Sequence, residues 1–153
     1  MKWKQPPIIK IYEALGAIAD GRVEREGMVA KVYSSSRNKF YNVSYDSEKR
    51  AIMCNDNGSF WKGYLGYPAI AFLMLIGEIN YSDDIALLLK DIAWKDINQQ
   101  FKNDFDKTLV YILKDKTEEE RAKLEQHCSI ILERIQELDL SLLGAKTKPP
   151  EGY

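Results

Sequence analysis

The chain has 153 residues, 45% of them hydrophobic and 29% charged, with a formal net charge of −1, which is typical of one globular domain. Its longest apolar run is far shorter than the roughly 20 residues that span a bilayer, so no membrane association is predicted. Two cysteines and one histidine are fewer soft ligands than a structural zinc site uses, and they predict reduced thiols in a cytoplasmic protein without a metal or cofactor.

The first half of the chain predicts a helix followed by a small antiparallel sheet. Pro6-Pro7 open the helix and Asp20-Gly21 end it, because proline fits the first helical turn and glycine fits a left-handed cap. Apolar and polar residues then alternate in 28–33 and 39–45, and 51–54 is a third short apolar run. Polar turns separate these runs, so we expect three strands in an antiparallel meander.

The second half predicts helices. The apolar segment from Pro68 to Gly77 predicts a buried helix, and Ser82 is the expected N-cap of the next one. Thr117 begins a capping box at the start of the last long helix. In that helix, apolar residues recur in alternating steps of four and three, as in a coiled-coil seam: Leu124, Cys128, Ile131, Ile135 and Leu138.

Together these elements predict a single α+β domain over residues 1–145. It consists of a small antiparallel β-meander packed on helices, with a long C-terminal helical hairpin. The arms of the hairpin are expected at 97–116 and 117–142, within a helical region 82–142. Residues 146–153 contain two prolines and one glycine and predict a flexible tail.

Motifs of known catalytic sites are missing from the sequence. It has no glycine-rich phosphate loop with its lysine and no nucleophile elbow. Ser34-Ser35-Ser36 has no histidine nearby in the sequence and is interpreted as a hydroxyl-rich turn. His127 and Cys128 are adjacent, but neighbouring helical positions point about 100° apart, so Cys128 is interpreted as a core residue and His127 as its neighbour at the solvent edge. We therefore expect that the protein is not an enzyme, and no small-molecule substrate is predicted.

Basic and aromatic residues mix in the strand that starts at Lys39 and in the segment 60–67. Residues 1–81 are also mildly basic, with eleven Lys and Arg against eight Asp and Glu. Such a mixture can grip a peptide or stack nucleobases. The predicted binding surface consists of Arg37, Lys39, Tyr41, Trp61, Lys62 and Tyr64. Because the net charge is close to zero, we favour a protein partner or self-association over nucleic acid.

One third of the chain, residues 31–79, resembles the SWIM-type zinc finger. The resemblance rests on Ser34-Ser35-Ser36, Tyr41-Asn42-Val43, Ile52-Met53-Cys54 and the glycine-containing segment 66–73, which fall in the order of that family.

The resemblance implies a hairpin and helix whose zinc site has degenerated. Ile52, Ala69 and Ala71 stand where three ligands would be, so Cys54 is left as a possible relic ligand and no metal is expected. SWIM modules are associated with DNA binding and with protein–protein contact, and the resemblance implies a binding role of that kind.

Two classes of function follow from the sequence. The first is a non-catalytic binding module that acts through the hairpin and the aromatic segment, on a protein or more weakly on nucleic acid. The second is a structural or assembly subunit that dimerises through its C-terminal helices. The coiled-coil seam motivates the second class, although an intramolecular hairpin would use the same apolar residues.

Overall fold

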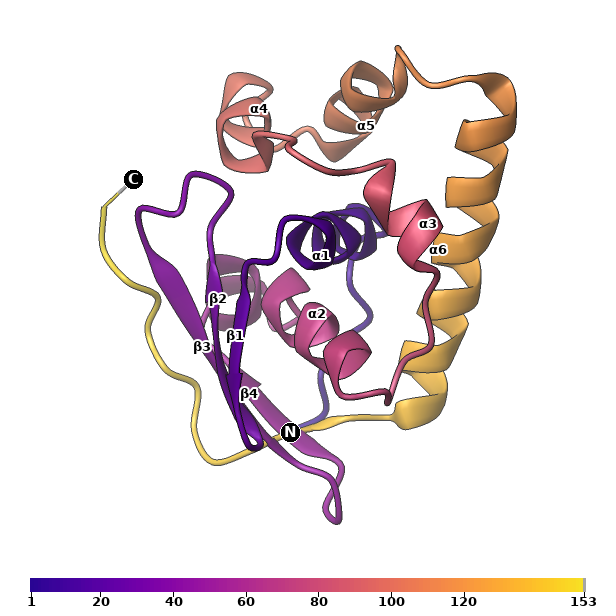
Figure 1. The fold of residues 1–153 in the computed structure, drawn as a ribbon. Helices are drawn as coiled ribbons and strands as arrows, with labels where there is room; N and C mark the ends of the chain where they lie inside the picture. The colour runs from indigo at the N-terminus through magenta and orange to yellow at the C-terminus, as the bar shows by residue number, and fades with distance from the viewer. Residues whose placement is uncertain (153) are drawn as a thin grey trace.

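In the computed structural model, which describes residues 1–152, the chain adopts the predicted α+β class (Figure 1). Five strands form one sheet in the order β1-β2-β3-β4-β5. Neighbouring strands are antiparallel except for β4 and β5, which are parallel. The strands are β1 (Val23–Glu26), β2 (Val29–Tyr33), β3 (Phe40–Asp46), β4 (Ala51–Cys54) and β5 (Ser141–Leu142).

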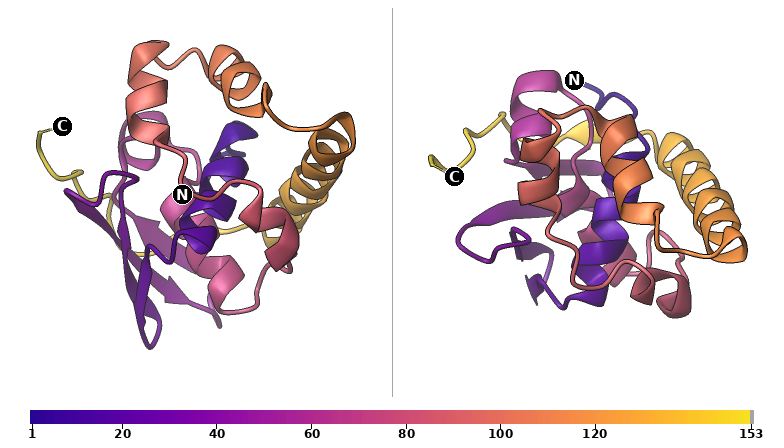
Figure 2. Two further views of the ribbon diagram at one scale, coloured as in Figure 1. Left: turned by 45° about the horizontal axis from the view of Figure 1, so that its top comes forward. Right: turned by 90° about the horizontal axis from the view of Figure 1, so that it is seen from above.

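Seven helical elements accompany the sheet in the described part of the chain. Figures 1 and 2 show α1 and α2 side by side next to the sheet, α6 on the side away from the sheet, and α4 and α5 above α1. No helix among residues 1–152 is both long and apolar enough to cross a membrane. The elements are α1 (Ile9–Ala19), the π-helix η1 (Gly58–Lys62), α2 (Tyr67–Leu75), α3 (Asp83–Leu87), α4 (Trp94–Gln100), α5 (Phe105–Leu113) and α6 (Glu118–Leu138).

The core lies between the sheet and the pair α1 and α2. The alternation predicted for the second and third strands is confirmed, since their inward residues are buried and their alternate residues are exposed or half-buried. The cross-strand pairs Ala30 with Val43 and Val32 with Tyr41 form this inner face. The predicted apolar helix is also confirmed, because every residue from Pro68 to Met74 of α2 is buried.

Two strands were not predicted from the sequence. β1 contains two glutamates and an arginine, and its exposed edge position leaves no apolar alternation to detect. β5 has only two residues, which bond to distant backbone: the N–H of Ser141 donates to the carbonyl of Arg50 at 2.9 Å, and that of Leu142 donates to Met1 at 2.8 Å. Such a strand depends on long-range packing, which local patterns do not report.

The helical half differs in detail from the predicted hairpin. The first arm, 97–116, is divided between α4 and α5, because the chain turns at Lys102 and Asn103 with φ angles of 53° and 61°. The second arm begins as predicted, with the Thr117 capping box, and α6 then packs chiefly on α1 and α3.

The coiled-coil seam of α6 faces the core of its own chain. All five seam residues are at most 3% exposed. They therefore do not form a free apolar surface for a second copy, and the observation that motivated dimerisation is accounted for within one chain.

The segment after β5 returns along the sheet toward η1 and the β2–β3 turn (Figure 1). The amide of Asn55 donates to the carbonyl of Lys148 at 3.4 Å, and the ammonium of Lys39 donates to the carbonyl of Gly152 at 2.9 Å. Residues 146–152 of the predicted tail thus end beside the third strand, and Tyr153 lies outside the described residues.

The contact between α1 and the start of α4 depends on Gly16. A Cβ atom at this position would lie 2.6 Å from Nε1 of Trp94 and 3.2 Å from the carbonyl oxygen of Leu89. Trp94 is 2% exposed, so its ring has no free space into which to move.

We predict that Gly16→Ala lowers the free energy of unfolding by about 1–3 kcal/mol, the usual effect of overpacking. In an unobstructed helix the same change would be stabilising. Urea unfolding of the variant, alone and combined with Trp94→Leu, tests this contact, because the smaller side chain should remove most of the penalty. An equal penalty in both backgrounds would contradict the prediction.

Candidate ligand-binding site

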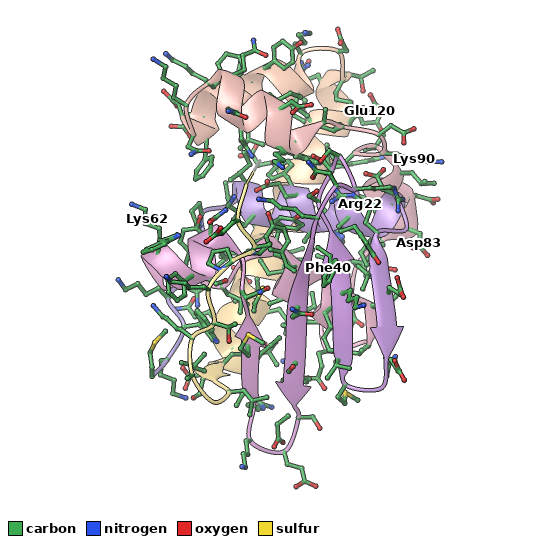
Figure 3. The ribbon with its side chains drawn as sticks, turned by 90° about the vertical axis from the view of Figure 1, so that its left-hand side faces the viewer. Arg22, Phe40, Lys62, Asp83, Lys90 and Glu120 are labelled. Atoms are coloured by element: carbon green, nitrogen blue, oxygen red, sulfur yellow. The ribbon has the colours of Figure 1, made fainter. Side chains whose placement is uncertain are left out.

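A cavity of about 960 Å³ opens between the sheet side of the molecule and the helices above it. Its walls come from α1, the β2–β3 turn, β3, η1, the start of α2, α4 and the start of α5. Figure 3 shows the side of the molecule on which the labelled Lys62 lies, at η1 and below α4 and α5. Elements that are far apart in the sequence therefore meet around one space.

The floor of the cavity is formed by two charged residues of α1. Lys10 and Glu13 are three positions apart, so they lie on one face of the helix, and Nζ of Lys10 is 2.8 Å from Oε2 of Glu13. Both side chains are largely buried, at 13% and 6% exposed. The amide of Asn98 on α4 donates to the other carboxylate oxygen of Glu13 at 3.1 Å. One buried carboxylate thus joins the floor to the helix above it.

The charges of this pair are maintained by their surroundings. Burial lowers the pKa of Lys10, but the nearby Glu13 carboxylate and, more weakly, Tyr64 and Asp56 outweigh that effect and leave the pKa raised. Lys10 is therefore an ammonium ion, which also lies 4.7 Å from the centre of the Phe105 ring in a cation–π contact. The floor carries two opposite charges that compensate each other.

Asn98 has a buried acceptor without a partner. Its Oδ1 makes no hydrogen bond to the described residues, although the residue is only 7% exposed and lines the cavity. Most buried polar atoms have a partner in the protein or in ordered water. A ligand or water that donates a hydrogen bond would satisfy this oxygen.

Three tyrosines line the inner wall: Tyr41 from β3, Tyr64 after η1, and Tyr67 at the start of α2. Burial, followed by the charge of Asp56, raises the pKa of Tyr41 to about 12, and burial also raises the pKa values of the other two. Their hydroxyls are consequently neutral donors and acceptors. The Tyr64 ring depends on Gly58, where a Cβ atom would lie within 2.4 Å of it.

Positive charge gathers around the mouth of the cavity. Six cationic side chains line it against two carboxylates, and four of the six are lysines around the opening: Lys39, Lys62, Lys95 and Lys102. Burial and then the charge of Lys39, which directly precedes β3, lower the pKa of Lys95 on α4, so these two ammonium groups repel each other. A bound anion would relieve this repulsion.

The carboxylate of Asp56 is used to hold the wall in place. It accepts hydrogen bonds from the thiol of Cys54 at 2.8 Å and from the backbone N–H of Ser59 at 3.2 Å, and it is 5% exposed. The hydroxyl of Ser59 in turn accepts from the N–H of Gly66 at 3.1 Å, which connects η1 to α2. Burial raises the pKa of Cys54 well above its usual value, so the thiol stays protonated.

The four residues at the ligand positions of the SWIM resemblance lie in the core. Ile52, Ala69 and Ala71 are fully buried, and Cys54 is bonded to Asp56. Residues 1–152 contain no group of three His, Cys, Asp or Glu side chains that could hold a metal ion. The SWIM resemblance itself stays a prediction.

Five of the six residues in the predicted binding surface line the cavity, and the exception is Arg37. Arg37 lies in the β2–β3 turn with a φ angle of 62°, and its guanidinium donates to the carbonyl of Asp20 at 2.6 Å. Lys10, Glu13 and Asn98 also line the cavity and were not predicted from the sequence. A signal for the first two was present, since they are the only charged residues in an otherwise apolar helix.

The other residues singled out in the sequence have structural roles. Cys128 is fully buried, and burial raises its pKa to about 12. Nε2 of His127 accepts a hydrogen bond from the N–H of Ser82 at 3.1 Å. Ser34 is buried in the β2–β3 turn, where its hydroxyl donates to Oδ1 of Asn38 at 3.2 Å.

We predict that Glu13→Leu lowers the free energy of unfolding by roughly 3 kcal/mol, because it leaves the Lys10 ammonium buried without its partner. The double variant Lys10→Met/Glu13→Leu should lose much less, since apolar residues of similar volume replace both charges. Urea unfolding of the two variants measures the difference. Equal losses would show that the pair is not coupled.

Stability should also fall at high pH. In the folded chain the pKa of Tyr41 is about 12 instead of 10.0, so above pH 10 the unfolded chain releases this proton while the folded chain retains it. The free energy of unfolding therefore decreases as the pH rises from about 10 to about 12. Tyr41→Phe should flatten this decrease, as followed by chemical unfolding at each pH; an unchanged slope would argue against a buried neutral phenol.

A comparison with known proteins gives a family but no activity. No curated protein and no solved structure matches the chain. The family model described as "Uncharacterised conserved protein UCP014422" matches residues 3–141. The matched region includes the floor, the tyrosine wall and the four lysines at the mouth of the cavity. The chain therefore belongs to the family of uncharacterised conserved proteins UCP014422.

Proposed function

We propose that this protein binds a small organic anion in the cavity between α1, η1 and α4. The observation that carries the proposal is the division of the cavity into two zones. Its interior is uncharged overall, with three tyrosine hydroxyls and the compensated Lys10–Glu13 pair, while its mouth is lined by four lysines. Such a site fits a ligand with a polar uncharged part and an anionic part.

The size and shape of the cavity favour a small molecule over a protein. A volume of about 960 Å³ lies within the range of roughly 300–1,000 Å³ that is usual for small-molecule sites. The prediction of a protein partner over nucleic acid rests on a net charge close to zero and treats the aromatic and basic residues as a binding surface. Tyr41 is only 6% exposed and lies inside the wall, which favours a ligand that enters the cavity.

Two of the four lysines are available to an incoming anion. Among the described residues, the ammonium groups of Lys62 and Lys102 make no hydrogen bond or ion pair, and both side chains are exposed. Lys102 also has a left-handed φ angle of 53°, a conformation that glycine adopts with less strain. A lysine in this strained conformation is consistent with a role for its charge in binding an anion.

The chemistry of the site supports binding without catalysis. The tyrosine hydroxyls and both thiols have raised pKa values, so none of them is an activated nucleophile or base. Lys10 is held as a cation by Glu13, which makes it a binding group and not a nucleophile.

We expect reversal of the charges at the mouth to abolish anion binding. Thermal unfolding in a panel of organic phosphates and carboxylates should identify compounds that raise the melting temperature. Lys62→Glu/Lys102→Glu should remove these shifts. Lys90→Glu changes an exposed lysine outside the cavity, at the opposite edge of the view in Figure 3, and should leave them unchanged. Shifts that persist in the Lys62/Lys102 variant, or that are lost equally with Lys90→Glu, would contradict the proposal.

A further inference from the structure

Trp61 exposes a large aromatic surface at the mouth of the cavity. The residue is 65% exposed, precedes Lys62 and lines the cavity. Its ring meets that of Phe60 edge to face, with centroids 4.7 Å apart and planes at 88°. This contact supports the indole ring from one side and leaves it accessible to a planar partner.

The aromatic lining continues inward from Trp61. Tyr64 and Tyr41 follow along the wall, and Tyr67 packs against Tyr41 with the ring centroids 6.2 Å apart. A planar ring that enters the cavity therefore meets aromatic side chains at the mouth and hydroxyl groups inside. Nucleobases suit such a wall, because every base has a π-face to stack and an edge that forms hydrogen bonds.

The lysines that would hold an anionic group come from two sides of the cavity, and Lys39 lies beside the aromatic wall, with its ammonium 5.9 Å from the centre of the Tyr41 ring. Lys39 directly precedes β3, Lys95 is on α4, and Lys102 lies in the turn after α4, and all three line the cavity. The carbonyl of Gly152, which accepts from Lys39, shows that the ammonium of Lys39 can reach an oxygen at the mouth. A phosphate group between these lysines would offer several such oxygens.

From these observations we infer that the anion is a nucleotide, with its base against the aromatic wall that begins at Trp61 and its phosphate between Lys39, Lys95 and Lys102. The inference rests on the proposed function and specifies its ligand. A sugar phosphate would leave the indole ring unused, and inorganic phosphate would leave the interior hydroxyls and the amide oxygen of Asn98 without partners. A free nucleotide and the end of a single strand share the required chemistry.

Quenching of tryptophan fluorescence can test the inference directly. Trp61 is 65% exposed whereas Trp3 and Trp94 are only 8% and 2% exposed, so Trp61 offers a ligand by far the largest indole surface, although Trp94 also lines the cavity. Adenosine 5′-monophosphate and uridine 5′-monophosphate should bind about tenfold or more tightly than ribose 5-phosphate or inorganic phosphate, the scale expected from stacking one base. An oligothymidylate of about eight nucleotides distinguishes the two possible forms of the ligand. If it binds more tightly than the mononucleotides, the ligand is the end of a single strand. If it binds equally or more weakly, the ligand is a free nucleotide.

Variants separate stacking from charge. By calorimetry, Trp61→Ala should reduce nucleotide affinity to that of ribose 5-phosphate, whereas Trp61→Phe should retain most of it. Lys62→Glu/Lys102→Glu should weaken all four phosphate compounds. Tyr111→Ala, which changes an exposed aromatic residue on α5 outside the cavity, should have no effect. Circular dichroism should show that each variant is folded.

Different results would overturn the nucleotide inference and the proposed anion binding. Ribose 5-phosphate that binds as tightly as the nucleotides, with no effect of Trp61→Ala, would overturn the nucleotide inference and leave anion binding intact. If no anion binds, or if charge reversal at Lys62 and Lys102 changes no affinity, the proposed function itself is overturned.

Discussion

The buried carboxylate of Glu13 is the interaction on which the geometry of the cavity depends. It pairs with Lys10 on its own helix and accepts a hydrogen bond from Asn98 on α4. The amide contact joins α4 directly to α1. Further contacts also hold α4, among them the packing of Trp94 against Gly16 and the hydrogen bond from the N–H of Lys95 to the hydroxyl of Ser35 at 3.0 Å. The carboxylate thus sets the separation of floor and roof.

A pair of buried charges is a poor way to gain stability. Desolvation opposes their attraction, and apolar residues of similar volume often stabilise a core as well or better. The rest of α1 follows that rule, because its remaining buried residues are apolar or glycine. The two charged residues occur where α1 meets the cavity, together with the unpartnered oxygen of Asn98 and the tyrosine hydroxyls. Their position is consistent with a role in holding a ligand.

The elements that could be predicted are those with a local cause. The alternation in β2 and β3, the apolar α2 and the caps at Ser82 and Thr117 all depend on residues close together in sequence. β5 and the turn at Lys102-Asn103 could not be predicted, because the first pairs with backbone about 90 residues away and the second has no glycine to mark it.

The site shows the same division between local and long-range information. Lys39 and Tyr41 are two residues apart at the start of β3, and Trp61 and Lys62 are adjacent, so the mixture of charge and aromatic rings was visible in the sequence. The packing of η1 and β3 brings the Lys39–Tyr41 pair and the Trp61–Lys62 pair to the walls of one cavity. Lys10 and Asn98 come from helices, and Lys102 from the turn after α4, and no sequence motif indicates where these elements are placed. The composition of the surface could therefore be predicted, while its concave shape could not.

The most direct test of a ligand-binding cavity is to map the amides that respond to a ligand by nuclear magnetic resonance. During a titration with adenosine 5′-monophosphate, the account predicts saturable shifts in α1 around Lys10, in η1, in β3 and in α4. The outer face of α6 and the β3–β4 turn should not respond. A ligand-binding cavity would be contradicted by saturable shifts centred on those distant regions. It would also be contradicted if neither this nucleotide nor any anion that raises the melting temperature caused saturable shifts.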